Sequence, residues 1–297
     1  MRDRRLFQPM EKMILVYLTG VLAFILTFRR LIPGWPLLLA AQAAALLALV
    51  LFVRAQERFP SSTILRVSRD WLPLPFIFFS YRMIHFLINP VRNPGLLSDR
   101  DGLLIAADRF LFGGDPTRWL ERFAHPWLTE VMQLFYSTNY FLPLALLLIL
   151  YLGSRRVPFR HAVFLLTLAY FLSFIGYFLF PAIGPRFTLE HARPLEGLWL
   201  RDRLADWVYF MESHPRDCFP SGHTAIPLVT LWLARRFNRL LFRIYLPIVA
   251  GLIISTVYLR YHYVVDVIAG IALAGFAVSL ERLNPEYRTL RDKAFLF

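Results

Sequence analysis

Cysteine, lysine and acidic side chains are scarce in this 297-residue chain, and each scarcity excludes a kind of site. Cys218 is the only cysteine, so we expect neither an intrachain disulfide framework nor a cysteine-based metal cluster. The only lysines are Lys12 and Lys293, close to the two ends, so no lysine inside the chain is available for catalysis. Asp and Glu number 20 against 33 Lys and Arg, so nearly all of the excess positive charge comes from arginine.

Apolar residues are abundant instead. They make up 57% of the chain, aromatic residues make up 16%, and the mean hydropathy is +0.50. A soluble domain has about 45–50% apolar residues, so the composition indicates a membrane protein. The formal net charge of +13 could indicate nucleic-acid binding. We favour arginines in cytoplasmic loops as its cause, and expect a membrane rather than nucleic acid as the partner.

The apolar runs predict an all-α integral membrane protein with about eight transmembrane helices, because a helix needs roughly 20 residues to cross a bilayer. The predicted spans are 13–28, 36–53, 71–88, 127–152, 159–180, 224–234, 240–259 and 262–280. We divide the chain into N-terminal membrane helices (1–88), an extracytoplasmic or interfacial insert (89–123), a helical core (124–281) and a cytoplasmic tail (282–297).

Short loops dense in arginine alternate along the chain with longer inserts in which arginines are interspersed with acidic residues. The positive-inside rule assigns both termini and the loops at 54–69, 155–160 and 235–243 to the cytoplasm. The inserts 89–123 and 187–219 are then extracytoplasmic. A helix at 103–112 is expected to lie in the interface, and the second insert is predicted to be a lid. Polar positions in the fourth span are expected to make interhelical hydrogen bonds; they are Tyr136, Asn139 and Tyr140.

Two polar stretches, 217–223 (Asp-Cys-Phe-Pro-Ser-Gly-His) and 255–266, lie at the edges of apolar runs. Ionisable groups beside hydrocarbon are costly and indicate a functional site. Ser221 is predicted to cap a helix start, where free N–H groups suit a phosphate. His262 and Asp266 are four residues apart, so on a helix the carboxylate can hold the imidazole.

Together with Phe180 to Arg186, these stretches resemble the three signature motifs of the type 2 phosphatidic acid phosphatase superfamily. Cys218 to Ser221 and His262 to Val267 most resemble the subgroup that contains inositol phosphorylceramide synthases. The motifs span 180–270. The resemblance implies that the last six helices form the helical core of that superfamily. It also implies a metal-independent lipid phosphatase or phosphotransferase that uses no cofactor and acts on a lipid phosphate or phospholipid.

The resemblance further implies a role for each motif residue. His262 would attack phosphorus and form a phosphohistidine, Asp266 would fix its tautomer, and His223 would protonate the departing oxygen. The phosphate would be held by Arg186, Ser221 and the N–H of Gly222.

The chain departs from the superfamily pattern in two motifs. In the first motif, Leu179 and Phe187 stand where the pattern has a lysine and a proline, and in the third, Thr256 stands where it has an arginine. The missing lysine and arginine remove positive charge from the phosphate cradle, and they leave a degenerate, inactive member as an alternative. If the seventh helix continues to Arg260, that side chain shares a face with Thr256 and partly replaces the missing arginine. The alternative is that Arg260 contacts lipid headgroups.

Three functions remain open. A lipid phosphatase would use water to resolve the phosphohistidine, and a transferase would use a lipid alcohol. A transporter or lipid-binding protein on the same scaffold would need no nucleophile, so replacing His262 would leave its function intact. A serine intramembrane protease is disfavoured, because Ser221 stands at a helix start and lacks a Gly-x-Ser-Gly setting.

Overall fold

Helices make up all the regular secondary structure in the described part of the chain. The computed structural model describes residues 7–92, 99–212 and 216–284, and none of these residues lies in a strand. Predictions for parts of the two inserts (93–98 and 213–215) and for the terminal tails (1–6 and 285–297) lie outside the described residues. The chain forms two compact units, residues 1–97 with 282–297 and residues 98–281, and each is described by itself.

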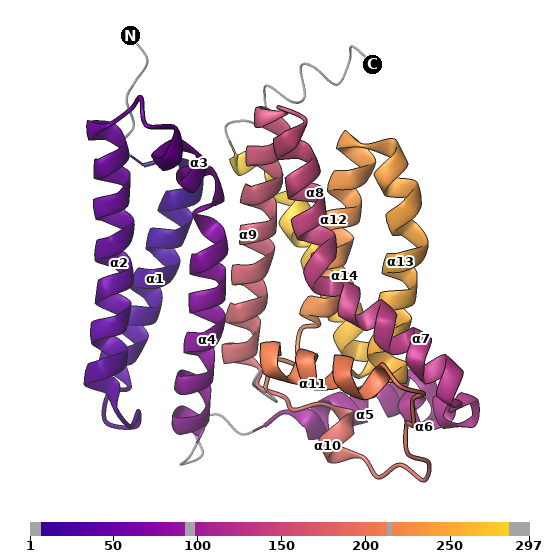
Figure 1. Cartoon of the computed structure of the whole chain (residues 1–297). Coiled ribbons are helices and arrows are strands. Elements are labelled where there is room, and N and C mark those ends of the chain that lie inside the picture. Colours follow the sequence, from indigo (N-terminus) through magenta and orange to yellow (C-terminus); the bar gives the residue numbers. More distant parts are fainter. Residues whose placement is uncertain (1–6, 93–98, 213–215, 285–297) are drawn as a thin grey trace. The chain divides into compact units, whose positions relative to one another are not determined.

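The first unit contains four helices: α1 (Pro9–Thr27), α2 (Trp35–Arg58), α3 (Thr63–Trp71) and α4 (Pro73–Arg92). Helix α1 packs against both α2 and α4 (Figure 1), and its residues Ile14 and Leu18 are fully buried. Glu11 of α1 accepts two hydrogen bonds from the Arg69 guanidinium of α3, at 2.6 and 2.9 Å. This pairing allows a fully buried carboxylate at the end of an apolar helix.

The second unit holds the motif residues. Its helices are α5 (Asp101–Phe112), α6 (Pro116–Leu120), α7 (Pro126–Ser137), α8 (Phe141–Leu152), α9 (Arg156–Leu179), α10 (Pro185–Thr188), α11 (Arg201–Glu212), α12 (Gly222–Phe237), α13 (Arg239–Tyr258) and α14 (Val264–Ser279). Helix α12 packs against α8, α9, α13 and α14. Its Ala225, Val229 and Leu233 are fully buried. Because it contacts four other helices, α12 is the centre of this unit.

Each of the eight predicted spans coincides with helix. Within the described residues, six helical segments are long and apolar enough to cross a membrane, and α3 with α4, bent by 42°, makes a seventh if the pair is one span. Helix α12 corresponds to the sixth predicted span; its 16 residues extend about 24 Å, which is short for a bilayer core. A 3₁₀ turn, Thr138–Tyr140, interrupts the fourth span between α7 and α8. Pro143 explains the interruption, because it cannot donate to the carbonyl of Asn139.

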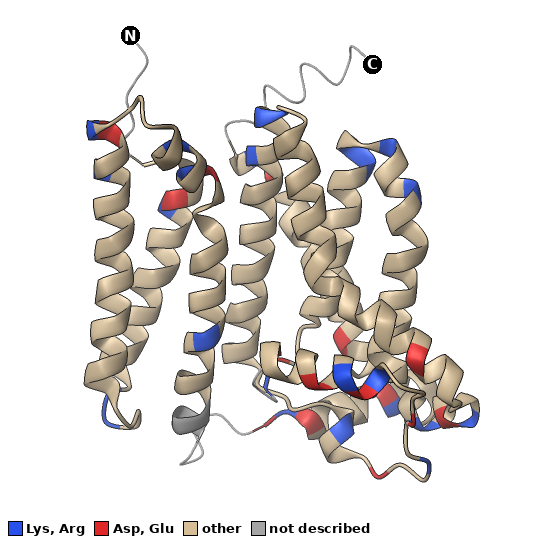
Figure 2. Ribbon diagram, in the orientation of Figure 1, with Lys and Arg blue, Asp and Glu red and all other residues tan. Residues whose placement is uncertain are grey.

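The helices outside the spans of the second unit gather at one end of it. Helices α5, α6, α10 and α11 lie where α9 ends and where α12 and α14 begin (Figure 1). The arginine-rich turns at 155–160 and 235–243 lie at the opposite end of the same helices (Figure 2). The interfacial helix predicted at 103–112 is α5, and the insert predicted as a lid contains α11. The three motifs therefore share one end of the unit with both inserts.

Candidate active site

The three motifs meet through their backbones. The N–H of Ser221 donates to the carbonyl of Asp266 at 3.1 Å, which joins the second motif to the third. The N–H of Arg186 donates to the carbonyl of Arg260 at 2.9 Å, which joins the first to the third. Gly184 has φ +89°, and a Cβ on it would lie 2.6 Å from the carbonyl oxygen of Tyr261. This approach requires glycine in the first motif.

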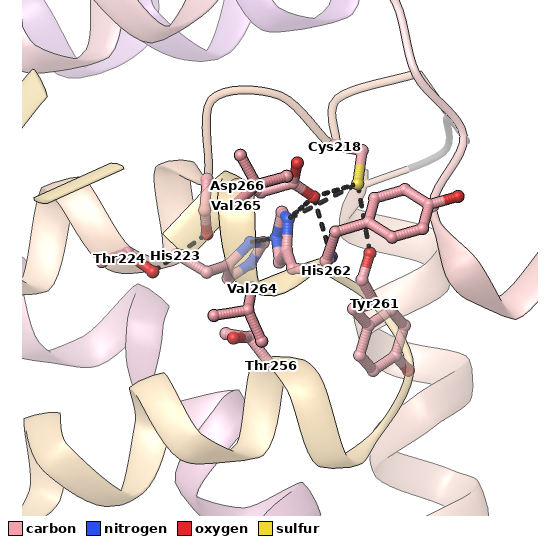
Figure 3. Close-up of polar contacts among 12 residues, drawn as sticks. Cys218, His223, Thr224, Thr256, Tyr261, His262, Val264, Val265 and Asp266 are labelled. Atoms are coloured by element: carbon pink, nitrogen blue, oxygen red, sulfur yellow. Dashed lines mark hydrogen bonds and ion pairs between the residues drawn. The ribbon is translucent and has the colours of Figure 1, made fainter. Parts of the chain in front are cut away.

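His262 and Asp266 form a buried pair at the start of α14. Nδ1 of His262 lies 3.5 Å from Oδ2 of Asp266, and the side chains are 3% and 0% exposed. His262 precedes the helix rather than lying on it, which corrects the expected shared helix face. Instead, Asp266 accepts the N–H of Tyr263 at 2.9 Å, and this capping contact turns its carboxylate back towards the imidazole (Figure 3). Because Nδ1 is the nitrogen that faces Asp266, Nε2 of His262 does not contact this carboxylate.

Cys218 is a third member of this cluster. Its Sγ donates to Oδ2 of Asp266 at 2.8 Å and lies 3.6 Å from Nδ1 of His262. Burial, and then the Asp266 carboxylate, raise the pKa of the Cys218 thiol well above its usual value, so the thiol is a neutral donor. The sequence predicted no metal cluster, yet these three side chains have ligand atoms within 4.8 Å of one another. Sulfur and oxygen ligands on a tetrahedral zinc lie about 3.5 Å apart. The 2.8 Å contact is therefore a hydrogen bond, and a metal would have to separate the two atoms.

His223 faces His262 across the motifs. Nδ1 of His223 lies 3.5 Å from Nε2 of His262 and 3.4 Å from the hydroxyl of Tyr136. The rings of Tyr136 and His223 stack with their centroids 4.5 Å apart. On the other side of the ring, Nε2 of His223 lies 3.0 Å from Oε1 of Glu212, at the end of α11. That oxygen also accepts hydrogen bonds from Tyr136 and Tyr140, each at 3.0 Å.

Glu212 was not predicted from the sequence as a site residue. It is one of several acidic residues in a polar insert, and no spacing distinguishes it from the others. The polar positions of the fourth span gave a partial signal, since Tyr136 and Tyr140 do make hydrogen bonds, but to the insert helix. Burial raises the pKa of Glu212, but the nearby His223 and the hydrogen bonds from the two tyrosines outweigh it. The net effect lowers the pKa, so the carboxylate is ionised.

A pocket opens over the two histidines. Its volume is about 50 Å³, which admits a few water-sized groups. Arg186, His223 and His262 line it, together with Val208, Tyr209 and Glu212 of α11. The insert predicted as a lid thus forms part of the pocket wall.

Two predicted phosphate-binding residues lie behind the pocket instead of lining it. Ser221 is fully buried at the N-cap of α12, but its side chain does not cap the helix. Its Oγ accepts from the Thr224 hydroxyl at 3.1 Å, which corrects the predicted capping role. A Cβ on Gly222 would lie 2.4 Å from the hydroxyl of Tyr177. This position therefore excludes a side chain.

Arg260 does not reach the pocket. Helix α13 ends at Tyr258, and Arg260 has φ +67°, so the expected helical face shared with Thr256 does not form. The Arg260 guanidinium donates to the carbonyl of Arg193 at 2.6 Å and to Oε1 of Glu121 at 3.4 Å. These contacts hold the second insert against the first. The left-handed backbone at Arg260 turns its side chain towards the inserts and away from the histidines.

Helix α5 anchors two motifs through carboxylates that sequence reasoning missed. Asp101 accepts the N–H groups of Ile183 and Gly184 in the first motif, and the hydroxyl of Tyr263. Asp108 accepts the first N–H groups of α14, from Val264 at 3.0 Å and Val265 at 2.9 Å. A carboxylate at a helix N-terminus satisfies free donors and opposes the helix dipole. Both contacts bridge long stretches of sequence, so no local pattern indicates them.

These features define an all-helical, multi-pass membrane protein whose site combines two histidines, a carboxylate and an arginine at one end of a helical core. Residues 103–280 match the PAP2 superfamily, the type 2 phosphatidic acid phosphatases. The match covers more than half of the chain and begins within α5; the chain belongs to this superfamily. Curated proteins and solved structures gave no significant match. Membership implies activity of the lipid phosphatase or phosphotransferase type, on lipid phosphates.

Proposed function

We propose that this protein transfers a phosphoryl group of a membrane lipid through a phosphohistidine on His262. The supporting observation is the chain of contacts from Asp266 through His262 to His223. A carboxylate at Nδ1 fixes the tautomer that leaves a lone pair on Nε2, the atom that faces His223.

The reaction then has two balanced steps. In the first, Nε2 of His262 forms a bond to phosphorus, the bond to the leaving oxygen breaks, and His223 gives that oxygen a proton. In the second, His223 takes a proton from water or a lipid alcohol, whose oxygen attacks phosphorus as the P–N bond breaks. Arg186 stabilises charge on the non-bridging oxygens, as a fixed cation in a phosphoryl-transfer site does.

The charges around the pocket favour a phosphodiester donor. Glu212 lies against His223, which leaves Arg186 and the nearby Asp217 facing the substrate. Leu179 and Thr256 are uncharged, whereas the superfamily pattern has a lysine and an arginine at these positions. A phosphomonoester brings up to two negative charges and a phosphodiester brings one, so the diester is easier to neutralise here. The resemblance to inositol phosphorylceramide synthases agrees with this choice, and inositol-phosphoryl transfer is the specific reaction that we propose.

The proposed site faces the extracytoplasmic side, and both termini are proposed to be cytoplasmic. The support is the distribution of arginine within the second unit, whose arginine-rich turns lie at the end of the helices opposite the site.

The experiment that tests this function uses purified protein with a panel of lipid phosphomonoesters and phosphodiesters, including phosphatidylinositol with and without ceramide. Free phosphate, released headgroup phosphate and new lipid products are all followed. Headgroup-labelled lipid should give an acid-labile label on the wild-type protein, and none on His262→Ala.

Turnover should fall by orders of magnitude in His262→Ala and persist in chelator. A folded His262→Ala protein with normal turnover refutes the phosphohistidine. A wild-type protein that turns over none of the lipids but binds or moves them favours the transporter alternative.

A further inference from the structure

One carboxylate outside the three motifs contacts the proposed acid. Glu212 ends α11, and its side chain reaches between Tyr136 and Tyr140 to His223. Its side chain is 14% exposed, and that of His223 is 11% exposed. The 3.0 Å separation of Oε1 and Nε2 makes an ion pair, although the ring N–H is not aligned for a straight hydrogen bond. A buried carboxylate needs compensation, and here two hydroxyls and an imidazole provide it.

The two nitrogens of His223 therefore have different surroundings. Nε2 faces the Glu212 carboxylate, whereas Nδ1 faces Nε2 of His262. A carboxylate beside one nitrogen favours the imidazolium, in which both nitrogens carry a proton. The proton on Nδ1 is then directed at the place where a substrate on His262 has its leaving oxygen.

We infer that Glu212 is a positioning residue that keeps His223 in the protonated form needed to expel the leaving group. This role rests on the proposed function, because it acts on the first step of that reaction. Its carboxylate lies 3.0 Å from Nε2 of His223, where it favours the charged ring and orients it. The acid is thus completed by the insert, not by the motif that supplies the histidine.

Other groups around His223 do not replace that charge. On α7 and the following 3₁₀ turn, Tyr136 and Tyr140 are neutral hydroxyls that bind Glu212 itself. Before α14, His262 is an imidazole already paired with Asp266. Asp217 and Arg186 line the same pocket with opposite charges. The Cys218 thiol is neutral and binds Asp266. Among the described residues, Glu212 is the carboxylate within ion-pair distance of His223.

The test compares wild-type protein with Glu212→Gln in the pH dependence of kcat/KM. Without the carboxylate, the imidazolium is less stable and loses its proton at lower pH. The alkaline limb should therefore move down by about one pH unit or more. On the alkaline side, turnover of an alkyl phosphodiester falls about tenfold for each unit. An aryl phosphodiester has a better leaving group that needs little protonation, so its turnover should fall much less.

Glu130→Gln is the matched control. Glu130 anchors the same insert by accepting the N–H groups of Leu198 at 2.8 Å and Leu200 at 2.7 Å. The substitution Glu130→Gln loosens the insert without changing the ion pair between Glu212 and His223, so the alkaline limb of the pH profile should stay where it is in wild type. Any loss should be equal for alkyl and aryl substrates.

Glu212→Asp provides a second variant if Glu212→Gln does not fold. It keeps the charge but is one methylene shorter, so the limb should move down by less than one unit. An unmoved limb with equal loss on both substrates, in either folded variant, overturns the inference while leaving the phosphohistidine intact. A wild-type protein with no turnover on any lipid refutes the proposed function itself, and with it the role of Glu212.

Discussion

Arg186 is the proposed phosphate clamp, and its removal gives a sharp test. Its guanidinium carbon lies 5.7 Å from the ring centre of Tyr261 and 5.8 Å from that of Phe187, and the side chain lines the pocket. Its backbone N–H holds the loop to Arg260, so Arg186→Ala should leave the fold intact. Loss of one preorganised donor costs about 2.7–4 kcal/mol, or roughly 10²–10³ in turnover. Arg186→Lys keeps the charge but not the planar guanidinium, so its turnover should lie between that of wild type and that of Arg186→Ala.

Arg260→Ala should lower folding stability and leave turnover nearly unchanged, the reverse of what is expected for Arg186→Ala. Its guanidinium binds Glu121 and the carbonyl of Arg193, so the loss should appear in folding stability, at about 1–3 kcal/mol. Turnover of folded protein should change less than about threefold, as expected for a residue outside the pocket. The assays are turnover on the best lipid of the panel and thermal unfolding in the same detergent. If Arg260→Ala matches the turnover loss of Arg186→Ala and melts like wild type, the assignment of the clamp is refuted.

Two other predictions concern the anchoring of the site and its orientation. Asp108→Asn should lower the free energy of unfolding by about 1–3 kcal/mol, because it discharges the acceptor of two N–H groups at the start of α14. Asp202→Asn, on an exposed side chain, should change it by less than about 1 kcal/mol; equal melting of the two variants would contradict the anchor. Reporters placed after Arg155 and after Glu196 should lie on opposite sides of the membrane, and finding both on one side would refute the proposed topology.

The helices and the motif positions were predictable because their signals are local. Apolar runs indicate spans whatever their neighbours are, and all eight predicted runs coincide with helices. The spacing of His262 and Asp266 correctly predicted that the two side chains lie close together, although a capping turn rather than a shared helix face places them there. The catalytic roles of these residues remain predictions for the proposed experiments.

The remaining features depend on backbone detail or on distant contacts. Arg260 was misplaced because α13 ends two residues earlier, and a left-handed residue then reverses the direction of the side chain. Ser221 has the sequence of a capping residue, but its hydroxyl pairs with Thr224 instead. Glu212 acts through partners that precede it by more than 70 positions, and no window of sequence contains both. Such pairs form only when the whole core has packed.

The carboxylates of α5 have a consequence for the way in which the protein is made. The N–H groups that Asp108 accepts belong to residues 156 and 157 positions later in the chain. A ribosome therefore releases α5 long before α14 exists, and Asp108 has no α14 N–H groups to accept until then. His262 and Asp266 arrive with that same helix. The growing chain thus carries no assembled His262–Asp266 pair until α14 is made, and the proposed site is completed in a single late step.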